Sequence, residues 1–130
     1  MTGFRLYKKE RLCRKSAIDA LFFGNSGAGS VMAYPWRAVW RVNEGRDVSC
    51  AQFLVSVPKK RLRHAVDRVV MRRRCREAFR LNRALLPTGS RVDIAFIYVG
   101  KGLTPYSDAQ RSVCRILGKI SEKISGNEAQ

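Results

Sequence analysis

Three segments of the chain alternate hydrophobic and polar residues, or are apolar throughout, and each predicts a strand. The first is Trp36 to Val42 and the second is Val48 to Val57, which Pro58 ends. The Gly-containing turn between them, Asn43 to Arg46, favours an antiparallel hairpin. The third segment, Arg91 to Val99, is apolar on both faces, which is typical of a central strand.

Three other segments repeat apolar residues with the helical period of about 3.6. A short helix is predicted from Ala17 to Phe23, after the capping residue Ser16. A second is predicted over residues 65–86, and a third from Thr104-Pro105, where a cap precedes a proline. The third helix carries an apolar stripe that we expect to face the core, namely Ala109, Val113, Ile116, Leu117, Ile120 and Ile124.

The remaining segments predict the domain organisation. Residues 24–30 are rich in glycine and are expected to form a flexible loop; their spacing does not match a phosphate-binding glycine motif. We see no internal linker or repeat. One domain is therefore expected over residues 1–124, followed by a disordered polar tail over residues 125–130.

The net charge of the chain limits the classes of molecule that it is expected to bind. Twenty-six Lys and Arg residues against ten Asp and Glu residues give a formal charge of +16. Such an excess predicts a polyanionic partner, most often a nucleic acid. No apolar run reaches the length of a membrane span or of a signal peptide, so we expect a cytoplasmic protein that binds no membrane.

The cysteines do not predict a metal site. Cys13, Cys50, Cys75 and Cys114 lie far apart, and His64 is the only histidine. Zinc sites usually need close pairs of ligands. We therefore expect reduced, mostly buried thiols, no metal site and no cofactor bound by the protein alone.

The strongest functional pattern is a basic segment at residues 59–83, with eleven cations and two acids, a net charge of +9. On a helix, Arg68, Arg72, Arg76 and Arg80 follow one another at i, i+4 spacing, and Arg73 and Arg83 fall on the same arc. Arg74 falls among the apolar residues and must extend to their edge. The apolar arc is expected to contain Val70, Met71, Cys75, Ala78, Leu81 and Leu85.

This arginine arc has two possible interpretations. A charged helix face is most often simply solvated. However, like charges at i, i+4 spacing repel each other, and the arc has few acids between its arginines. Arginine also binds phosphate with two parallel hydrogen bonds. We therefore favour a polyphosphate partner, and these residues alone leave DNA and RNA both open.

Several motifs in this region resemble the bacterial ribonuclease P protein subunit. They are Ser56-Val-Pro-Lys-Lys60, Ala65-Val-Asp-Arg68 and Met71-Arg-Arg-Arg-Cys-Arg-Glu-Ala-Phe-Arg80. Arg11 to Lys15, followed by Ile18 and Leu21-Phe22, is similar to the opening helix of that family. Where the family has Arg-Asn-Arg, this chain has Arg68-Val69-Val70, so the RNA contact expected of the asparagine cannot form at Val69.

The resemblance implies both a fold and a function. The fold is α+β, an α/β sandwich with a central, mostly antiparallel sheet and a left-handed β-α-β crossover (ribosomal protein S5 domain 2-like). The function is that of an accessory subunit of ribonuclease P, in which the RNA subunit removes the 5′ leader of precursor tRNA with Mg²⁺ held by the RNA. One protein monomer per RNA is implied.

The resemblance also implies site residues. The residues expected to bind the catalytic RNA are Lys59, Lys60, Arg61, Arg68, Arg72, Arg73, Arg76 and Arg80. The residues expected to line a cleft for the single-stranded leader, between the first helix and the sheet, are Arg11, Ile18, Phe22, Tyr34, Trp36, Phe53 and Ser56. Among the aromatic residues, core packing is favoured for Phe53, Trp36 is open to either interpretation, and the cleft is favoured for Phe22.

No residue of the protein is expected to be catalytic. The carboxylates form no metal-binding motif, and a single histidine gives no acid–base pair of the ribonuclease type.

Three alternatives remain beside the ribonuclease P interpretation. The first is a ribosomal-type protein that binds ribosomal RNA and does not rescue tRNA processing. The second is a DNA-binding regulator, although the arc lacks the Asn and Gln residues that usually contact bases. The third is a cationic membrane-surface protein, although the basic helix has few large aromatic residues.

Overall fold

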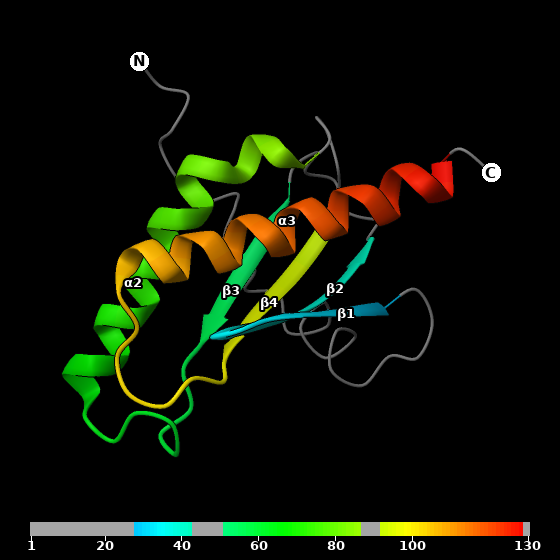
Figure 1. Cartoon of the computed structure of the whole chain (residues 1–130). Coiled ribbons are helices and arrows are strands. Elements are labelled where there is room, and N and C mark those ends of the chain that lie inside the picture. The colour runs from blue at the N-terminus through cyan, green and yellow to red at the C-terminus, as the bar shows by residue number, and fades with distance from the viewer. Residues whose placement is uncertain (1–27, 43–50, 87–91, 129–130) are drawn as a thin grey trace.

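The computed structural model describes residues 28–42, 51–86 and 92–128 (Figure 1). These residues form a four-stranded sheet and two long helices, and both helices cover the same face of the sheet. In chain order the elements are β1 (Ala28–Ala33), β2 (Trp36–Val42), β3 (Gln52–Ser56), α2 (Ala65–Asn82), the short 3₁₀ helix η2 (Arg83–Leu85), β4 (Val92–Tyr98) and α3 (Tyr106–Glu128).

The strand order in the sheet is β1-β2-β4-β3. β1 pairs with β2, and β2 with β4, in antiparallel orientation, whereas β3 and β4 are parallel. Parallel neighbours need a crossover connection, and α2 lies in the connection between β3 and β4. The α+β fold expected from the resemblance is confirmed, and so is the central position of β4.

The predicted hairpin between Trp36–Val42 and the following strand is wrong, because β4 lies between β2 and β3. A strand that is apolar on both faces is most stable with a neighbour at each edge, and β4 has both. The hairpin in the structure joins β1 to β2 through Tyr34–Pro35.

The pattern of hydrophobic and polar residues did not predict β1. Its first residues, Ala28 to Ser30, belong to the segment that the sequence predicted to be a loop, so that prediction is wrong for these three residues. Small residues and glycine give no alternation pattern, and only pairing with β2 shows this segment to be a strand. Residues 24–27 and the predicted helix at 17–23 lie outside the described residues.

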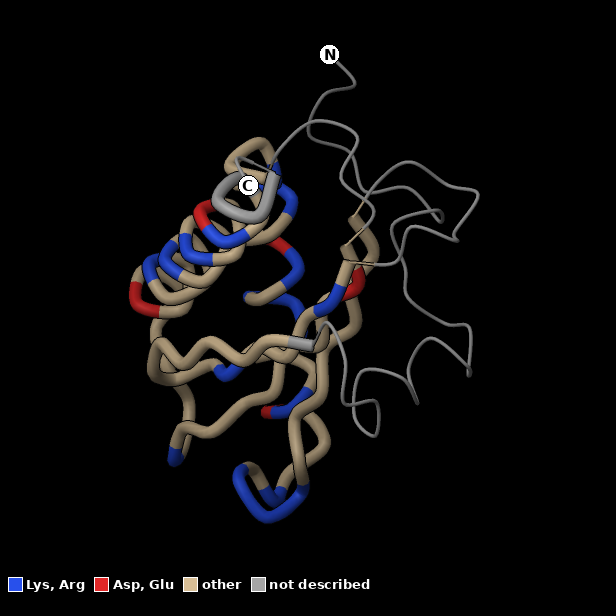
Figure 2. The backbone as a smooth tube through the Cα atoms, turned by 90° about the vertical axis from the view of Figure 1, so that its right-hand side faces the viewer, with Lys and Arg blue, Asp and Glu red and all other residues tan. Residues whose placement is uncertain are grey.

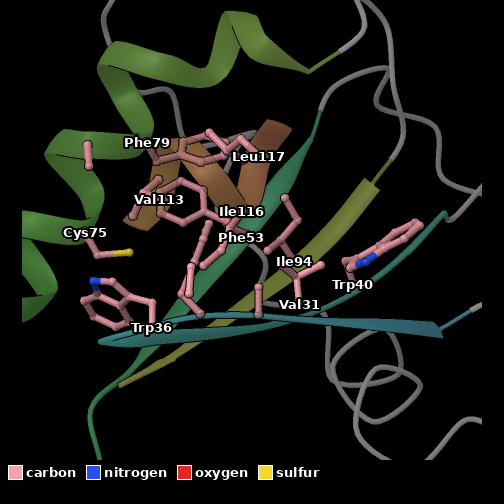
Figure 3. Packing of buried hydrophobic residues seen from close by; sticks show 14 of the residues in the cluster. Val31, Trp36, Trp40, Phe53, Cys75, Phe79, Ile94, Val113, Ile116 and Leu117 are labelled. Carbon is pink, nitrogen blue, oxygen red and sulfur yellow. The ribbon is translucent and has the colours of Figure 1, made fainter. Parts of the chain in front are cut away.

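The core fills the space between the sheet and the two helices (Figure 3). Trp36 on β2 meets Tyr98 on β4 edge to face, with ring centroids 5.1 Å apart. Phe53 on β3 stacks on Phe79 of α2 at 4.1 Å. The predicted apolar stripe of α3 is buried in this core, as expected. The helix continues to Glu128, beyond Ser125, where the sequence predicted the tail to begin.

The buried face of α2 differs from the predicted apolar arc. Met71, Cys75, Ala78 and Phe79 are buried, whereas Leu81 and Leu85 are exposed. The stacking of Phe79 on Phe53 fixes the rotation of the helix. Leu81 is therefore turned to solvent, and α2 has already given way to η2 before Leu85.

The opposite face of the sheet is covered by neither α2 nor α3. Strand alternation and register place side chains of β2, β4 and β3 there, and we call this set the open sheet face. Two of its members on β4, Asp93 and Ala95, are buried, whereas those on β2 and β3 are exposed or half-buried. The set consists of Arg37, Val39, Arg41, Gln52, Leu54, Ser56, Asp93, Ala95 and Ile97.

Candidate nucleic-acid interface

The arginines of α2 gather on the side of the helix that faces away from the core. We call this set the arginine face; it consists of Arg72, Arg73, Arg76, Arg80 and the following Arg83. Arg73 and Arg76 are exposed, and the other three are half-buried. Because the buried residues Met71, Cys75 and Phe79 fix the opposite side, the arginines cannot turn inward without unpacking the helix.

One acid lies beside the arginine face. Glu77 pairs with Arg80 three residues on, and the Arg80 Nε donates to a Glu77 carboxylate oxygen at 3.2 Å. This hydrogen bond, aided by the positive charge of Arg80, holds the pKa of Glu77 below its usual value of 4.5. Within the described residues, no acid forms an ion pair with Arg72, Arg73 or Arg76. These three cations are therefore the strongest candidates for binding an anion.

Arg74 has a structural role. Its guanidinium donates to the carbonyl oxygen of Thr104, in the loop before α3, and lies 3.8 Å from the Met71 sulfur. It therefore reaches the edge of the apolar surface, as the sequence predicted, and ties α2 to the start of α3.

Arg68 also binds its own chain. Its Nη1 donates to the carbonyl oxygens of Leu62 and Arg63, both at 2.9 Å. These two bonds hold the loop before α2 against the first turn of the helix. The sequence assigned Arg68 to RNA binding only, because spacing shows which side of a helix a residue occupies but not which loop folds back onto it.

The loop held by Arg68 is itself basic, and we call residues 59–63 the basic loop. It forms a turn in which the N–H groups of Arg61 and Leu62 both donate to the carbonyl oxygen of Pro58. Leu62 is buried and anchors the turn, whereas Lys59 and Lys60 are exposed and Arg61 is half-buried. In Figure 2 the loop is the blue bend at the bottom of the view. The fold therefore adds these cations to those at the start of α2.

Two exposed valines lie among these cations. Val66 is 73 % exposed and Val69 is 37 % exposed. At about 100° per residue, Val69 falls between Arg76 and Arg80 on the helical arc. An apolar residue at Val69 interrupts the row of hydrogen-bond donors where the related family has an amide. The arginine face is therefore suited to phosphate contacts on either side of this position.

Of the residues predicted to line a leader cleft, the four that the structure describes do not share one face of the sheet. Trp36 and Phe53 are buried in the core beneath the helices, so neither lines an open cleft. Of the two interpretations considered for each residue, the structure agrees with core packing. Ser56 lies on the open sheet face, and Tyr34 is exposed in the β1–β2 turn. Arg11, Ile18 and Phe22 lie outside the described residues.

Sequence reasoning missed the polar positions of β2. Arg37, Val39 and Arg41 alternate with the buried Trp36, Ala38 and Trp40, and so belong to the open sheet face. Arg37 Nε donates to Ser30 Oγ of β1 at 3.4 Å. The alternation that predicted the strand also places these three residues on the face opposite to Trp36.

Cys75 and Cys114, the two cysteines in the described part of the chain, belong to no cluster of possible metal ligands. Cys75 is free and fully buried, and burial raises the pKa of its thiol well above the usual 9.0. Cys114 is free and half-buried, and Cys13 and Cys50 lie outside the described residues. Across residues 28–42, 51–86 and 92–128, the His, Cys, Asp and Glu side chains form no cluster of three or more able to hold a metal ion. None of the described helices is both long and apolar enough to span a membrane.

The fold is shared with solved ribonuclease P proteins. The protein from Staphylococcus aureus superposes with a TM-score of 0.65 at 19 % identity, over 89 % of this chain and 94 % of that one. The protein from Thermotoga maritima superposes with a TM-score of 0.65 at 18 % identity, over 85 % and 96 %. At these identities the likeness defines a class of fold, a small basic α+β domain.

Sequence comparison identifies the family within that class. The ribonuclease P family model matches residues 6–121. A ribonuclease P protein component from Porphyromonas gingivalis is 36 % identical over 135 residues, which cover 96 % of each chain. A second strain of that organism has one that is 35 % identical over the same coverage. The chain belongs to the ribonuclease P protein family, and the resemblance found in its motifs is confirmed.

Proposed function

We propose that this protein binds the catalytic RNA of ribonuclease P through the arginine face and the basic loop, and so assists that RNA in removing the 5′ leader of precursor tRNA. The observation that carries the proposal is the position of Arg72, Arg73 and Arg76. They share one side of a rigid helix, and within the described residues no acid neutralises them. Family membership supplies the partner.

Phosphate is the group that this surface suits. A guanidinium presents several N–H donors in a plane, which match two oxygens of one phosphate. Contacts of this kind position an RNA without selecting its sequence. Arg74 supports the arrangement by tying α2 to the segment before α3, which keeps the arginine face fixed relative to the sheet.

We place the leader on the open sheet face rather than on the face beneath the helices. Ser56, Arg37 and Val39 provide a hydroxyl, a cation and an apolar surface there. Arg11, Ile18 and Phe22 are proposed to complete this cleft from the N-terminal segment. A single strand can bind such a surface through its backbone and through stacking.

We propose that the RNA subunit, and not the protein, catalyses the cleavage of precursor tRNA. Mg²⁺ bound by the RNA would activate the attacking water, and the protein would only neutralise phosphates and hold the leader. The clustering of carboxylates that a metal site of the protein would need is absent from the described residues. RNA-free protein that cleaved precursor tRNA in the presence of magnesium would contradict this part of the proposal.

Reconstitution with a bacterial ribonuclease P RNA tests the proposal. The double variant Arg72→Glu/Arg76→Glu should weaken binding of the catalytic RNA and slow leader removal at low magnesium, because each change replaces an attraction to phosphate with a repulsion. The matched control is Lys119→Glu/Lys123→Glu, which makes the same charge change on exposed residues of α3. Circular dichroism should show that both variants are folded.

Two results would overturn the proposal. One is a folded Arg72→Glu/Arg76→Glu protein that still binds the catalytic RNA with unchanged affinity. The other is wild-type protein that binds RNA tightly yet fails to promote leader removal at any magnesium concentration, which would favour a ribosomal-type RNA-binding protein.

A further inference from the structure

A second surface with the chemistry of RNA binding lies away from the arginine face, at the end of the sheet where β1 turns into β2. A cavity of about 260 Å³ opens there between this turn and the first half of α3. This volume is below the roughly 300–1,000 Å³ typical of sites for larger ligands, so the cavity suits one small group. Its lining consists of Ala33, Tyr34, Pro35, Thr104, Asp108, Arg111, Ser112 and Arg115.

Hydrogen bonds hold the rim of the cavity in place. The Ser112 hydroxyl, buried on α3, donates to the carbonyl oxygen of Ala33. The N–H of Val99 donates to the carbonyl oxygen of Pro35 at 2.8 Å. These bonds tie the β1–β2 turn to α3 and to the end of β4, so the cavity is a fixed feature of the fold.

Tyr34 stands at the mouth of the cavity with 65 % of its surface exposed. Its hydroxyl oxygen accepts a hydrogen bond from the Lys101 N–H at 3.4 Å. The ring is thus held at its polar end while the aromatic surface stays accessible. An exposed aromatic ring held in this way is suited to stack on a planar ligand such as a nucleobase.

Two arginines supply the charge. Arg111 and Arg115 lie one turn apart on the exposed side of α3, and both line the cavity. Asp108, the one carboxylate in the lining, lies 3.7 Å from Arg111 in an exposed ion pair, which is a weak interaction in water. The exposed Lys101 lies next to Tyr34. The site therefore keeps a net positive charge.

We propose that this cavity binds one nucleotide of a single-stranded RNA, with its base stacked on Tyr34 and its flanking phosphates on Arg111 and Arg115. The inference rests on the proposed function for the identity of the polymer. A single strand is favoured over a duplex because only an unpaired base exposes a face to an aromatic ring. The basic loop leaves the sheet at the same end (Figure 1), so one RNA can reach both surfaces.

Binding of two labelled probes by the full-length protein tests this site. One probe is a ten-nucleotide oligouridine, and the other is an abasic strand with the same number of phosphates. Tyr34→Ala should weaken binding of oligouridine by about 5- to 140-fold, the usual range for loss of one stacked base, and leave the abasic strand unaffected. Tyr34→Phe keeps the ring but loses the hydrogen bond from Lys101, and should weaken oligouridine binding less than Tyr34→Ala does.

The arginines are tested by charge reversal on the same helix. Arg111→Glu/Arg115→Glu should weaken binding of both probes. It should also reduce the slope of log affinity against log salt concentration by about 1.4, since each single-strand phosphate contributes about 0.7 to that slope. Lys119→Glu/Lys123→Glu makes the same charge change one to two turns beyond the cavity and should have a much smaller effect. Equal effects of the two double variants, or oligouridine binding that Tyr34→Ala leaves unchanged, would overturn the proposal.

The reconstituted ribonucleoprotein then identifies the source of the strand. If the leader occupies the cavity, Tyr34→Ala weakens binding of precursor tRNA with a ten-nucleotide leader but not of tRNA lacking a leader. If the catalytic RNA occupies it, the variant weakens assembly of the complex instead. Wild-type behaviour in both assays would contradict a role of this cavity in the complex. Failure of the proposed function would appear separately, as RNA assembly unaffected by Arg72→Glu/Arg76→Glu.

Discussion

Arginines with the same spacing on α2 have different roles, which depend on what each guanidinium contacts. Arg72 and Arg76 form no ion pair with the described residues, whereas Arg68 donates to two backbone carbonyls and Arg74 to a third. Sequence spacing placed these side chains correctly around the helix. It could not separate an arginine that donates to a backbone carbonyl from one that forms no ion pair with the described residues, because the carbonyl acceptors come from loops whose paths the spacing does not determine.

Removal of Arg68 should therefore lower stability, whereas removal of Arg72 should not. Arg68→Ala loses two hydrogen bonds to carbonyls, and we expect the unfolding free energy to fall by about 1 kcal/mol. This corresponds to a melting temperature lower by about 3–5 °C in a domain of this size. Thermal unfolding followed by circular dichroism measures the change.

Arg72→Ala is the matched control, because it removes the same charge from the same helix without a hydrogen bond to the described residues. Its melting temperature should stay close to that of the wild type, as is usual for surface substitutions. If the two variants melt at the same temperature, the bonds made by Arg68 do not hold the basic loop.

At the scale of elements, one acid of α2, Glu77, lies beside the arginine face and pairs with Arg80. Glu77 relieves repulsion near Arg80 and is held ionised by the hydrogen bond from Arg80, which lowers its pKa. A carboxyl group with a lowered pKa adds stability at neutral pH, and this contribution is lost as the pH falls through its folded-state pKa, below 4.5. The contribution is small because the pair is exposed to solvent.

Glu77→Gln should therefore strengthen RNA binding with little loss of stability. The substitution removes a negative charge beside Arg73, Arg76 and Arg80, so the electrostatic attraction to phosphate increases. We expect binding to catalytic RNA to tighten a few-fold at low salt and the gain to diminish as salt is added. Titration of labelled RNA at two salt concentrations measures it, with Glu122→Gln on α3 as the control. A gain that persists at high salt would not be electrostatic.

Strand pairing was the least predictable part of the fold. β2, β4 and α3 follow from alternation and from the apolar stripe, and their buried residues match those patterns. β1 is short of hydrophobic residues and gives no such signal. The neighbours of β3 depend on α2 crossing to β4, which is a long-range contact, whereas a local turn signal favours the nearest strand.

At the scale of the whole molecule, the two faces of the sheet differ in what covers them and in which side chains they carry. One face is closed by α2 and α3 and contains the aromatic residues Trp36 and Phe53, which makes it the core. The other carries Arg37, Val39 and Ser56 and is left uncovered by both helices. Motif resemblance identified the family correctly and the sequence favoured the core for Phe53, but the structure was needed to assign Trp36 to the core.

The cations of the molecule should make RNA binding strongly dependent on salt. The chain carries a charge of +16, and the arginine face, the basic loop and the cavity beside Tyr34 present many of its cations to solvent. If about six to ten phosphates are neutralised, affinity for the catalytic RNA should fall roughly 10³- to 10⁵-fold between about 50 and 200 mM salt. Arg72→Glu/Arg76→Glu removes two of these contacts and should reduce the slope of log affinity against log salt by about 1.8. Lys119→Glu/Lys123→Glu should leave the slope nearly unchanged, because these residues lie outside all three surfaces. A wild-type affinity that hardly responds to salt would mean that these surfaces do not contact the RNA backbone, whatever the charge of the chain.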